Sequence, residues 1–476
     1  MNPRLAIAAC LIVAGNLFTP AARGEDLLVG LASVEITPPP GYRMSGYFNE
    51  RFNTGVHDPL FAKAIVFRQG DVGFAWVMCD IIGPEHPVSA AARARIAERT
   101  KLPVDAVMIH GTHSHTGPLY KGVLRRYFHD QAIARTGKDA AEPYDYSEFL
   151  RDRIVEAVEQ ADAAKQPLVL RTGVVPQPGI AFNRRFHMKD GSVRFNPGRR
   201  NPDIVRVAGP IDPDVSVLGV QTAQGEAVAA VTSLALHLDT VSGTNYSADY
   251  PFALEKTLQA RFGPKFLSLF GTGTCGDINH IDVTAMSQKS GPAEAARIGV
   301  ALGSAVNHGW DALVPIEQPR LGYAVRTIDW PMQEYTAEQM QSAEANLPKI
   351  GTNALSFLDQ VTAVKIADVA ARRAERPDGM VALRVQVYRL SDSAAVVALP
   401  GEVFVELGLA IKKASPFAWT AIIELSEDSP AYIPTVKAFG EGSYETVNSI
   451  IKPGGGEKMV EAAVELLNEL KSEKGN

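Results

Sequence analysis

The segment His110-Gly111-Thr112-His113-Ser114-His115-Thr116-Gly117-Pro118 is the part of the chain around which we expect the fold to be organised. It follows residues 104–109, a β-branched and apolar run that predicts a buried strand. On an extended backbone, residues two apart point to the same side, so His113 and His115 are predicted to lie side by side at the strand end. Neutral imidazole is a favoured zinc ligand and titrates near neutral pH. The segment therefore indicates a metal ligand beside a general acid or base, and a hydrogen-bonded surface loop is the alternative.

The composition is that of a large globular protein. The chain has 476 residues, of which 46% are hydrophobic. This length allows two or three domains, or one large α/β enzyme. The 47 Lys and Arg against 53 Asp and Glu give a net charge of −6, which argues against a nucleic-acid-binding protein.

The N-terminus has the features of an export signal. Arg4 precedes an apolar stretch over residues 5–18, and Ala22-Arg23-Gly24 provides small residues for cleavage before Glu25. We therefore expect residues 1–24 to be a signal peptide and residues 25–476 to form one exported domain, periplasmic or secreted. No later segment has the length and apolarity of a membrane span.

Two cysteines remain after this cleavage, Cys79 and Cys275. An oxidising compartment would allow one disulfide between them, and the sequence leaves open whether it forms.

The hydrophobic patterns predict an α/β protein with mixed β-sheets flanked by helices. Strands are expected at residues 28–36, 60–67, 72–82, 168–175, 216–222, 227–236, 266–270, 381–390, 394–399 and 420–425. Helices are expected at residues 88–100, 147–164 with Ser147 as N-cap, 252–262, 292–312, 337–374 with an interruption near Gly351, 401–413 and 457–471. A hairpin with an Asp-Gly turn is expected within residues 181–191.

Polar residues recur where the apolar runs end. They are Asp80, His113, His115, His237, Asp277, His280 and Glu402. In an α/β enzyme the loops at the strand ends form one crevice, so we expect a metal site there. Alternatives for single residues remain open: His237 as a hydrogen-bonded core histidine, and Glu402 as a residue that favours the N-terminal dipole of the expected helix at 401–413.

The chain resembles the catalytic region of the neutral/alkaline non-lysosomal ceramidases. The motifs that carry the resemblance are Val34-Glu35-Ile36-Thr37-Pro38-Pro39, Gly55-Val56-His57-Asp58-Pro59-Leu60-Phe61-Ala62, Gly111 to Pro118, Asn183-Arg184, Leu236-His237, Ser247-Ala248-Asp249-Tyr250-Pro251, Gly276-Asp277, Leu399-Pro400-Gly401-Glu402, and Tyr432 with Tyr444-Glu445. They span nearly the whole chain after residue 24, in the order of the family.

The resemblance implies an amidohydrolase that holds one Zn²⁺. Its substrate would be a lipid amide or another small amide. Its ligands would be His113, His237, Glu402 and Tyr432, with a position left open for water or substrate. His115 and Tyr444 would stabilise the developing oxyanion or transfer protons. Arg184 would orient the polar head of the substrate, as the family implies.

The sequence departs from the family in two places. Ceramidases carry a serine two positions after Gly-Asp, whereas Asn279 stands there in this chain. A water molecule activated by the zinc then becomes the expected nucleophile, with Asp277 or His280 as helpers and Cys275 as a rival nucleophile. We also expect no counterpart of the family's C-terminal immunoglobulin-like domain.

Three hypotheses follow for function. The first is an exported zinc hydrolase that cleaves an N-acyl sphingoid or related amide. The second is a zinc-containing binding protein without catalytic activity, motivated by the missing serine. The third is a hydrolase of sugar or peptide amides, motivated by polar loops at residues 42–53 and 196–213.

Overall fold

Three large sheets form the frame of the protein. The computed structural model describes residues 26–287 and 289–473, so the expected signal peptide at 1–24 lies outside the described residues. The first sheet has the order β5 (Val107–Gly111), β4 (Val72–Cys79), β3 (Phe61–Gln69), β1 (Leu28–Glu35), β6 (Gln166–Pro167). The second has the order β15 (Leu267–Thr272), β13 (Ala227–Leu234), β12 (Asp214–Gln221), β7 (Val169–Pro176), β17 (Val314–Pro315). The third has the order β18 (Pro319–Pro331), β19 (Met380–Ser391), β20 (Ala394–Ala398), β22 (Trp419–Ile423).

Each sheet combines antiparallel pairs with one parallel pair. The parallel pairs are β4 with β5, β13 with β15, and β20 with β22. The predicted class, mixed sheets flanked by helices, is confirmed. The inner faces of all three sheets share one hydrophobic core, to which they contribute Trp76, Leu218 and Tyr388, respectively.

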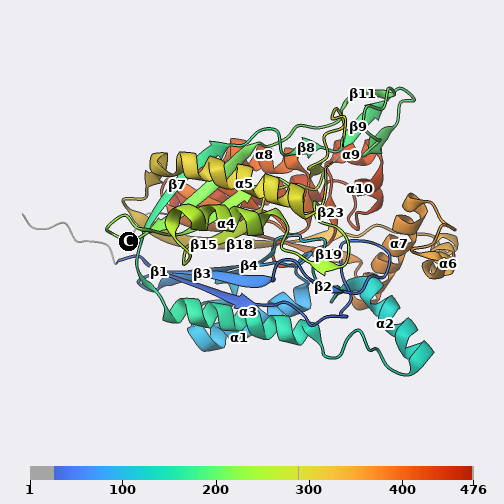
Figure 1. The fold of residues 1–476 in the computed structure, drawn as a ribbon, viewed down its shortest axis with the longest axis horizontal. Coiled ribbons are helices and arrows are strands. Elements are labelled where there is room, and N and C mark those ends of the chain that lie inside the picture. The colour runs from blue at the N-terminus through green and yellow to red at the C-terminus, as the bar shows by residue number, and fades with distance from the viewer. Residues whose placement is uncertain (1–25, 288, 474–476) are drawn as a thin grey trace, which may run out of the picture.

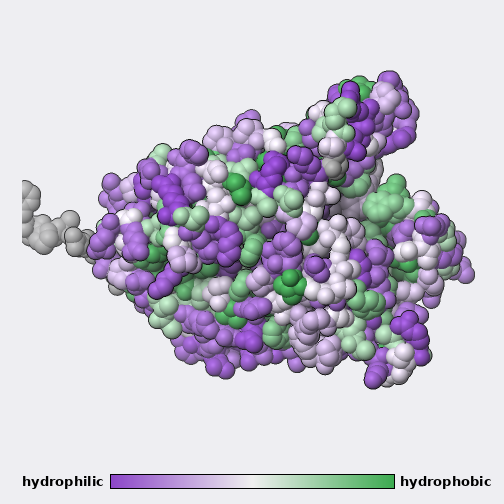
Figure 2. Space-filling model, in the orientation of Figure 1, coloured by the Kyte–Doolittle hydropathy of each residue, from purple (hydrophilic) through white to green (hydrophobic). Residues whose placement is uncertain are grey.

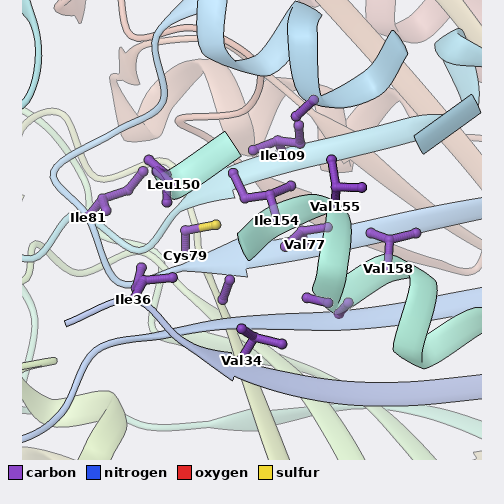
Figure 3. Packing of buried hydrophobic residues seen from close by; sticks show 14 of the residues in the cluster. Val34, Ile36, Val77, Cys79, Ile81, Ile109, Leu150, Ile154, Val155 and Val158 are labelled. Atoms are coloured by element: carbon purple, nitrogen blue, oxygen red, sulfur yellow. The ribbon is translucent and has the colours of Figure 1, made fainter. Parts of the chain in front are cut away.

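Helices cover the outer faces (Figure 1). α1 (His86–Thr100) and α3 (Tyr146–Ala163) cover the first sheet, α4 (Tyr250–Phe262) and α5 (Pro292–Gly309) the second, and α8 (Val405–Ala414) and α11 (Gly455–Ser472) the third. Figure 3 shows how Val34, Val77 and Ile109 of the first sheet meet Ile154 and Val158 of α3. No helix among the described residues is both long enough and apolar enough to cross a membrane.

Smaller elements project beside the strand ends. A three-stranded unit of β10 (Val193–Phe195), β9 (Arg185–Met188) and β11 (Ile204–Val207) stands out from the body, near α9 (Val436–Glu441) and α10 (Tyr444–Val447). α2 (Gly122–Thr136), α6 (Ala337–Asn346) and α7 (Phe357–Glu375) lie at the same end of the molecule (Figure 1). β9 and β10 form the hairpin predicted around Asp190-Gly191.

His110 connects the three sheets at one point. It lies in β5, and its Nδ1 donates to the carbonyl of Glu424 just after β22, at 2.6 Å. Its Nε2 accepts from the backbone N–H of Thr272 in β15, at 3.1 Å. The Glu424 N–H in turn donates to the Thr272 carbonyl, at 2.9 Å. The imidazole is fully buried, so it fixes the mutual position of one strand end from each sheet.

Several predicted boundaries are wrong. The strand before the histidine segment begins only at Val107, because Val104–Ala106 forms a 3₁₀ turn. The N-cap of α3 is Asp145, whose carboxylate accepts from two backbone N–H groups, so Ser147 is not the cap. The long strand β18 and the short β11 were not predicted; β11 has only four residues and lies within the polar loop expected at residues 196–213. The interrupted helix at 337–374 is confirmed as α6 and α7.

Replacing His110 by leucine tests this connection. His110→Leu removes the partner of the buried Thr272 N–H and leaves the Glu424 carbonyl with only a longer hydrogen bond from Ser426, at 3.4 Å. A buried polar group that loses its partner costs about 1–3 kcal/mol. We expect the free energy of unfolding at pH 7, measured by urea denaturation, to fall by about 2–4 kcal/mol. His308→Leu, at an exposed helix end, is the control and should change little.

The pH dependence of the free energy of unfolding of the wild type and of His110→Leu gives a second measurement. Burial lowers the pKa of His110 from 6.5 to about 3. Between these values the unfolded chain binds a proton that the folded chain does not, so the wild type loses up to about 1.4 kcal/mol per pH unit as pH falls. The His110→Leu variant lacks this contribution. The difference in free energy of unfolding between the wild type and the variant should therefore narrow below pH 6.5. A constant deficit down to pH 4 would contradict the burial of a neutral imidazole.

Candidate metal centre

His113, His237 and Glu402 converge at one point. The Nε2 atoms of the two histidines lie 2.9 Å apart. Oε2 of Glu402 lies 3.3 Å from Nε2 of His113 and 3.4 Å from Nε2 of His237. All three side chains are buried, although they are separated by more than 100 residues along the sequence.

Each of the three residues follows a strand of a different sheet. His113 follows β5 of the first sheet, His237 follows β13 of the second, and Glu402 follows β20 of the third. Glu402 lies in the short strand β21 (Glu402–Val403), which pairs in parallel with β23 (Tyr432–Ile433). The start of the helix predicted at residues 401–413 is therefore wrong, because α8 begins only at Val405. The dipole alternative for Glu402 fails with it.

The backbone at His113 differs from the expected extended form. Its φ of +79° lies in the left-handed region, which non-glycine residues rarely adopt. The N–H of His113 donates to the Ile81 carbonyl at 2.9 Å, which holds this conformation. His113 and His115 still lie together, with their Nε2 atoms 3.3 Å apart, but a turned backbone brings them there. Strained residues of this kind are common at functional sites.

The hydrogen bonds of the two rings at Nδ1 direct their Nε2 atoms inward. Nδ1 of His113 donates to the Ile82 carbonyl (2.6 Å) and Nδ1 of His237 to the Cys275 carbonyl (3.1 Å). Burial, followed by Arg184 and His113, keeps the pKa of His237 well below its usual value, so this ring is neutral. The two Nε2 atoms therefore face each other, next to a carboxylate oxygen, Glu402 Oε2, that has no hydrogen-bond partner among the described residues.

This donor set fits a zinc ion. Ligand atoms about 2.0–2.2 Å from a tetrahedral zinc lie roughly 3.3–3.6 Å from one another, close to the spacings found here. A bound cation would satisfy the facing lone pairs and the orphan carboxylate oxygen together. Tyr432, in β23 beside Glu402, is buried. Against the effect of burial, His113, His237 and Tyr432 hold the pKa of the Glu402 carboxylate below its usual range, which places the phenol near the same point.

His115 belongs to a second, overlapping group. The ring nitrogens of His113, His115 and His237 also satisfy the spacing of a metal cluster. Burial, with His113 next, lowers the pKa of His115 to about 4, so it is neutral. His115 is therefore either a reacting group beside the metal, as predicted, or a third imidazole ligand in place of Glu402.

Arg184 and Tyr444 form the wall beside Tyr432. The Arg184 guanidinium donates to Glu445 (3.0 Å) and to the Gly276 carbonyl (2.7 Å), and its carbon lies 5.4 Å from the centroid of the Tyr432 ring. The rings of Tyr432 and Tyr444 lie 5.4 Å apart. The structure thus brings the predicted residues Arg184, Tyr432 and Tyr444 together next to the histidines.

Asp277 and His280 are hydrogen-bonded to residues outside the group of His113, His237 and Glu402. Oδ1 of Asp277 accepts from the Val405 N–H (2.9 Å) and Oδ2 from Asn183 (2.7 Å), so its carboxylate links two loops. His280 pairs with Asp239 at 3.1 Å. Their predicted part in catalysis stays a prediction. Asn279, at the position of the family's serine, is fully buried, and its amide donates to Asn196 at 3.2 Å.

Sequence reasoning missed Asp239 and Glu424. Opposing the effect of burial, the His280 hydrogen bond and the nearby His237 and His115 hold the pKa of Asp239 below its usual value, which places its charge beside the histidines. Asp239 follows His237 by two residues, and this spacing was a sequence signal that could have identified it. Glu424 accepts from the Val403 N–H (2.6 Å) and from the Cys275 thiol (3.1 Å) and so holds Glu402 and the His237 loop in place.

The two cysteines are not bonded to each other. Both are buried as free thiols. Burial, followed by Glu424, raises the pKa of Cys275 well above its usual value. A protonated, enclosed thiol is a poor nucleophile, which disfavours the rival assignment of Cys275.

Comparisons with known proteins give a consistent result. No family model matches the sequence. The chain is 27% identical over 250 residues to the neutral ceramidase of Pseudomonas aeruginosa, and the match covers 50% of this chain and 34% of that protein, about a third of its length. The crystal structure of the same neutral ceramidase superposes with a TM-score of 0.69 at 18% identity, covering 94% of this chain and 75% of the other. A ceramidase complexed with C2 gives 0.69 at 16% identity, with 95% and 77% covered. The resemblance is confirmed: the fold is that of a neutral ceramidase-like catalytic domain.

Metal analysis of variants separates the two overlapping groups. If Glu402 is a ligand, Glu402→Gln and His237→Ala should each weaken zinc binding by more than about 100-fold, as judged by competition with a chelating dye. His115→Ala should retain zinc. His308→Ala is the control for histidine removal. Zinc loss in His115→Ala with retention in Glu402→Gln would assign the three-histidine set instead.

Proposed function

We propose that this protein is a zinc-dependent amidohydrolase that cleaves an N-acyl amide, related in reaction to the ceramidases. The single observation that carries the proposal is the convergence of His113 Nε2, His237 Nε2 and Glu402 Oε2 at one point. The neutral ceramidase-like fold supports an amide substrate. A zinc ion bound there would act as a Lewis acid for the scissile carbonyl and lower the pKa of water.

The chain's own residues would orient and stabilise the reacting amide. Burial, followed by Glu402, raises the pKa of Tyr444 to about 12, so its phenol stays protonated at neutral pH. Asn448 donates to the Tyr444 oxygen at 3.1 Å, which leaves the phenol proton free for another acceptor. Tyr444 can therefore donate to a carbonyl oxygen as it gains negative charge. His115, neutral and lining the same cavity, can accept a proton from the attacking water or pass one to the leaving amine.

Arg184 would bind the polar part of the substrate, because its neighbours keep the guanidinium charged. Its pKa stays far above neutrality despite burial, because Tyr432 and Glu445 favour the charged form. Glu445 is shared with Arg185 at 2.9 Å, so the Arg184 charge is only partly balanced. The Arg184 guanidinium lies 5.9 Å from the centroid of the Tyr444 ring, so a fixed positive charge stands beside this phenol.

Activity measurements test the function directly. Purified protein should hydrolyse N-acyl amides, lose the activity with a zinc chelator and regain it on zinc addition. His115→Ala and Tyr444→Phe should each lower kcat by about 100-fold with folding unchanged. A flat profile across lipid amides, sugar amides and peptides, with zinc bound, would instead support the binding-protein hypothesis that Asn279 suggests.

Cys275→Ala separates this mechanism from a thiol nucleophile. The backbone carbonyl that orients His237 is unchanged by the substitution. We expect kcat/KM to fall by less than about tenfold, or about 1.4 kcal/mol in the barrier. Loss of all activity in a correctly folded variant that still binds zinc would contradict a water nucleophile.

A further inference from the structure

One cavity opens from the histidine cluster toward α2 and α7. It has a volume of about 220 Å³ and is lined on one side by His113, His115 and Glu402. Residues of α7 line it with one helical face, Val364, Lys365, Asp368 and Arg372. The apolar part of its wall comes from Phe48, Leu119, Val123 and Leu124.

Lys365 is an unusual component of this wall. Only 5% of the residue is exposed, although lysine is almost never buried without a full set of partners. Its ammonium can donate three hydrogen bonds. Among the described residues its one charged contact is with Asp368, at 3.5 Å, which is longer than a normal charge-assisted hydrogen bond.

Asp368 does not neutralise Lys365 alone. The Nε of Arg372 lies 3.3 Å and 3.4 Å from the two carboxylate oxygens of Asp368, closer than Lys365. Two cations therefore share this one carboxylate, and the next acid, Asp428, lies 4.0 Å from Arg372. Lys121, the other lysine of the cavity, is satisfied differently, because it donates to the Pro84 carbonyl at 2.6 Å.

Lys365 also interacts electrostatically with Glu402 of the histidine cluster. Burial lowers its pKa, and the charge of Glu402 is one of the groups that raise it again. Lys365 lines the same cavity as His113, His115 and Glu402, where the scissile amide would sit. A buried cation with open donors is costly, and an anionic group of a ligand would remove that cost.

We propose that Lys365 binds a carboxylate carried by the substrate, so that the protein acts on N-acyl amino acids or similarly acidic amides in preference to neutral ones. The reaction part of this inference rests on the proposed hydrolase function, and the binding part does not. The apolar lining would receive part of the acyl chain, and the ammonium would select the acidic end. In this assignment Lys365 determines specificity and takes no part in the bond cleavage.

The test uses matched ligands that differ only at the acidic group. N-(dodecylsulfonyl)glycine and N-(dodecylsulfonyl)ethanolamine resist hydrolysis, and their binding to the zinc-loaded full chain is measured by calorimetry. We expect the wild type to bind the glycine compound about tenfold more tightly or better. Lys365→Met should remove this preference, and Lys365→Arg should keep part of it. Lys349→Met, on the nearby surface, should leave it unchanged.

Hydrolysis of N-lauroylglycine and N-lauroylethanolamine by the same variants separates the two proposals. A kcat/KM preference for the glycine amide that disappears in Lys365→Met would support both. A binding preference that depends on Lys365 without any hydrolysis would overturn the hydrolase function and keep the assignment of Lys365. Equal binding of the two sulfonamides, or a preference retained in a folded Lys365→Met, would overturn the assignment whatever the activity. Melting temperatures of all variants identify misfolding, and Lys365→Arg supplies a folded cation if Lys365→Met fails to fold.

Discussion

The buried imidazole of His110 is the contact on which the arrangement of the site depends. By accepting from Thr272 and donating to the Glu424 carbonyl, it fixes the ends of strands from three sheets at one place. The proposed ligands follow the strands of these sheets within a few residues. Because each loop is short, the position of the strand ends largely determines where His113, His237 and Glu402 can reach. This is the strand-end crevice of α/β folds, here built from three sheets instead of one.

Buried carboxylates outside the proposed metal site hold the loops around it in place. Asp277 connects the N-terminus of α8 to Asn183, Glu424 receives the Val403 N–H, and Glu445 joins two arginines. Burying acids is costly unless they are hydrogen-bonded, and each of these acids has at least two partners. Gly276 completes the arrangement, because a Cβ there would lie 2.5 Å from the Glu402 carbonyl oxygen. The Gly-Asp motif is thus explained by loop packing, independently of any role in catalysis.

The sequence was sufficient for the features set by local pattern and insufficient for those set by distant contacts. The paired strands, the hairpin at Asp190-Gly191 and the polar strand ends follow from periodicity and turn chemistry. The strand at Glu402 could not be predicted, since its pairing partner β23 lies about thirty residues away and each strand is only two residues long. The left-handed backbone of His113 depends on a hydrogen bond to Ile81, and Lys365 reaches the site only because α7 packs there. Tertiary packing decides such features, and a single sequence does not display it.

The entrance of the site and its depth differ in chemistry, and this limits the ligands that fit. Phe195, Phe357 and Tyr444 stack within 6.5 Å of one another between the β9–β10 hairpin and α7, and Phe357 is 49% exposed. Figure 2 shows apolar residues in the recess between the hairpin and the α6–α7 region. An apolar chain can therefore lie against this aromatic cluster, whereas the cavity beside the histidines is lined by Lys365. The resemblance places Asn279 where ceramidases carry a serine. The Asn279 amide donates a hydrogen bond to Asn196, and the position offers no hydroxyl group. The amphiphilic amide with an acidic inner end that we propose would satisfy these surfaces, whereas a neutral two-chain lipid would leave the buried Lys365 with only its 3.5 Å contact to Asp368.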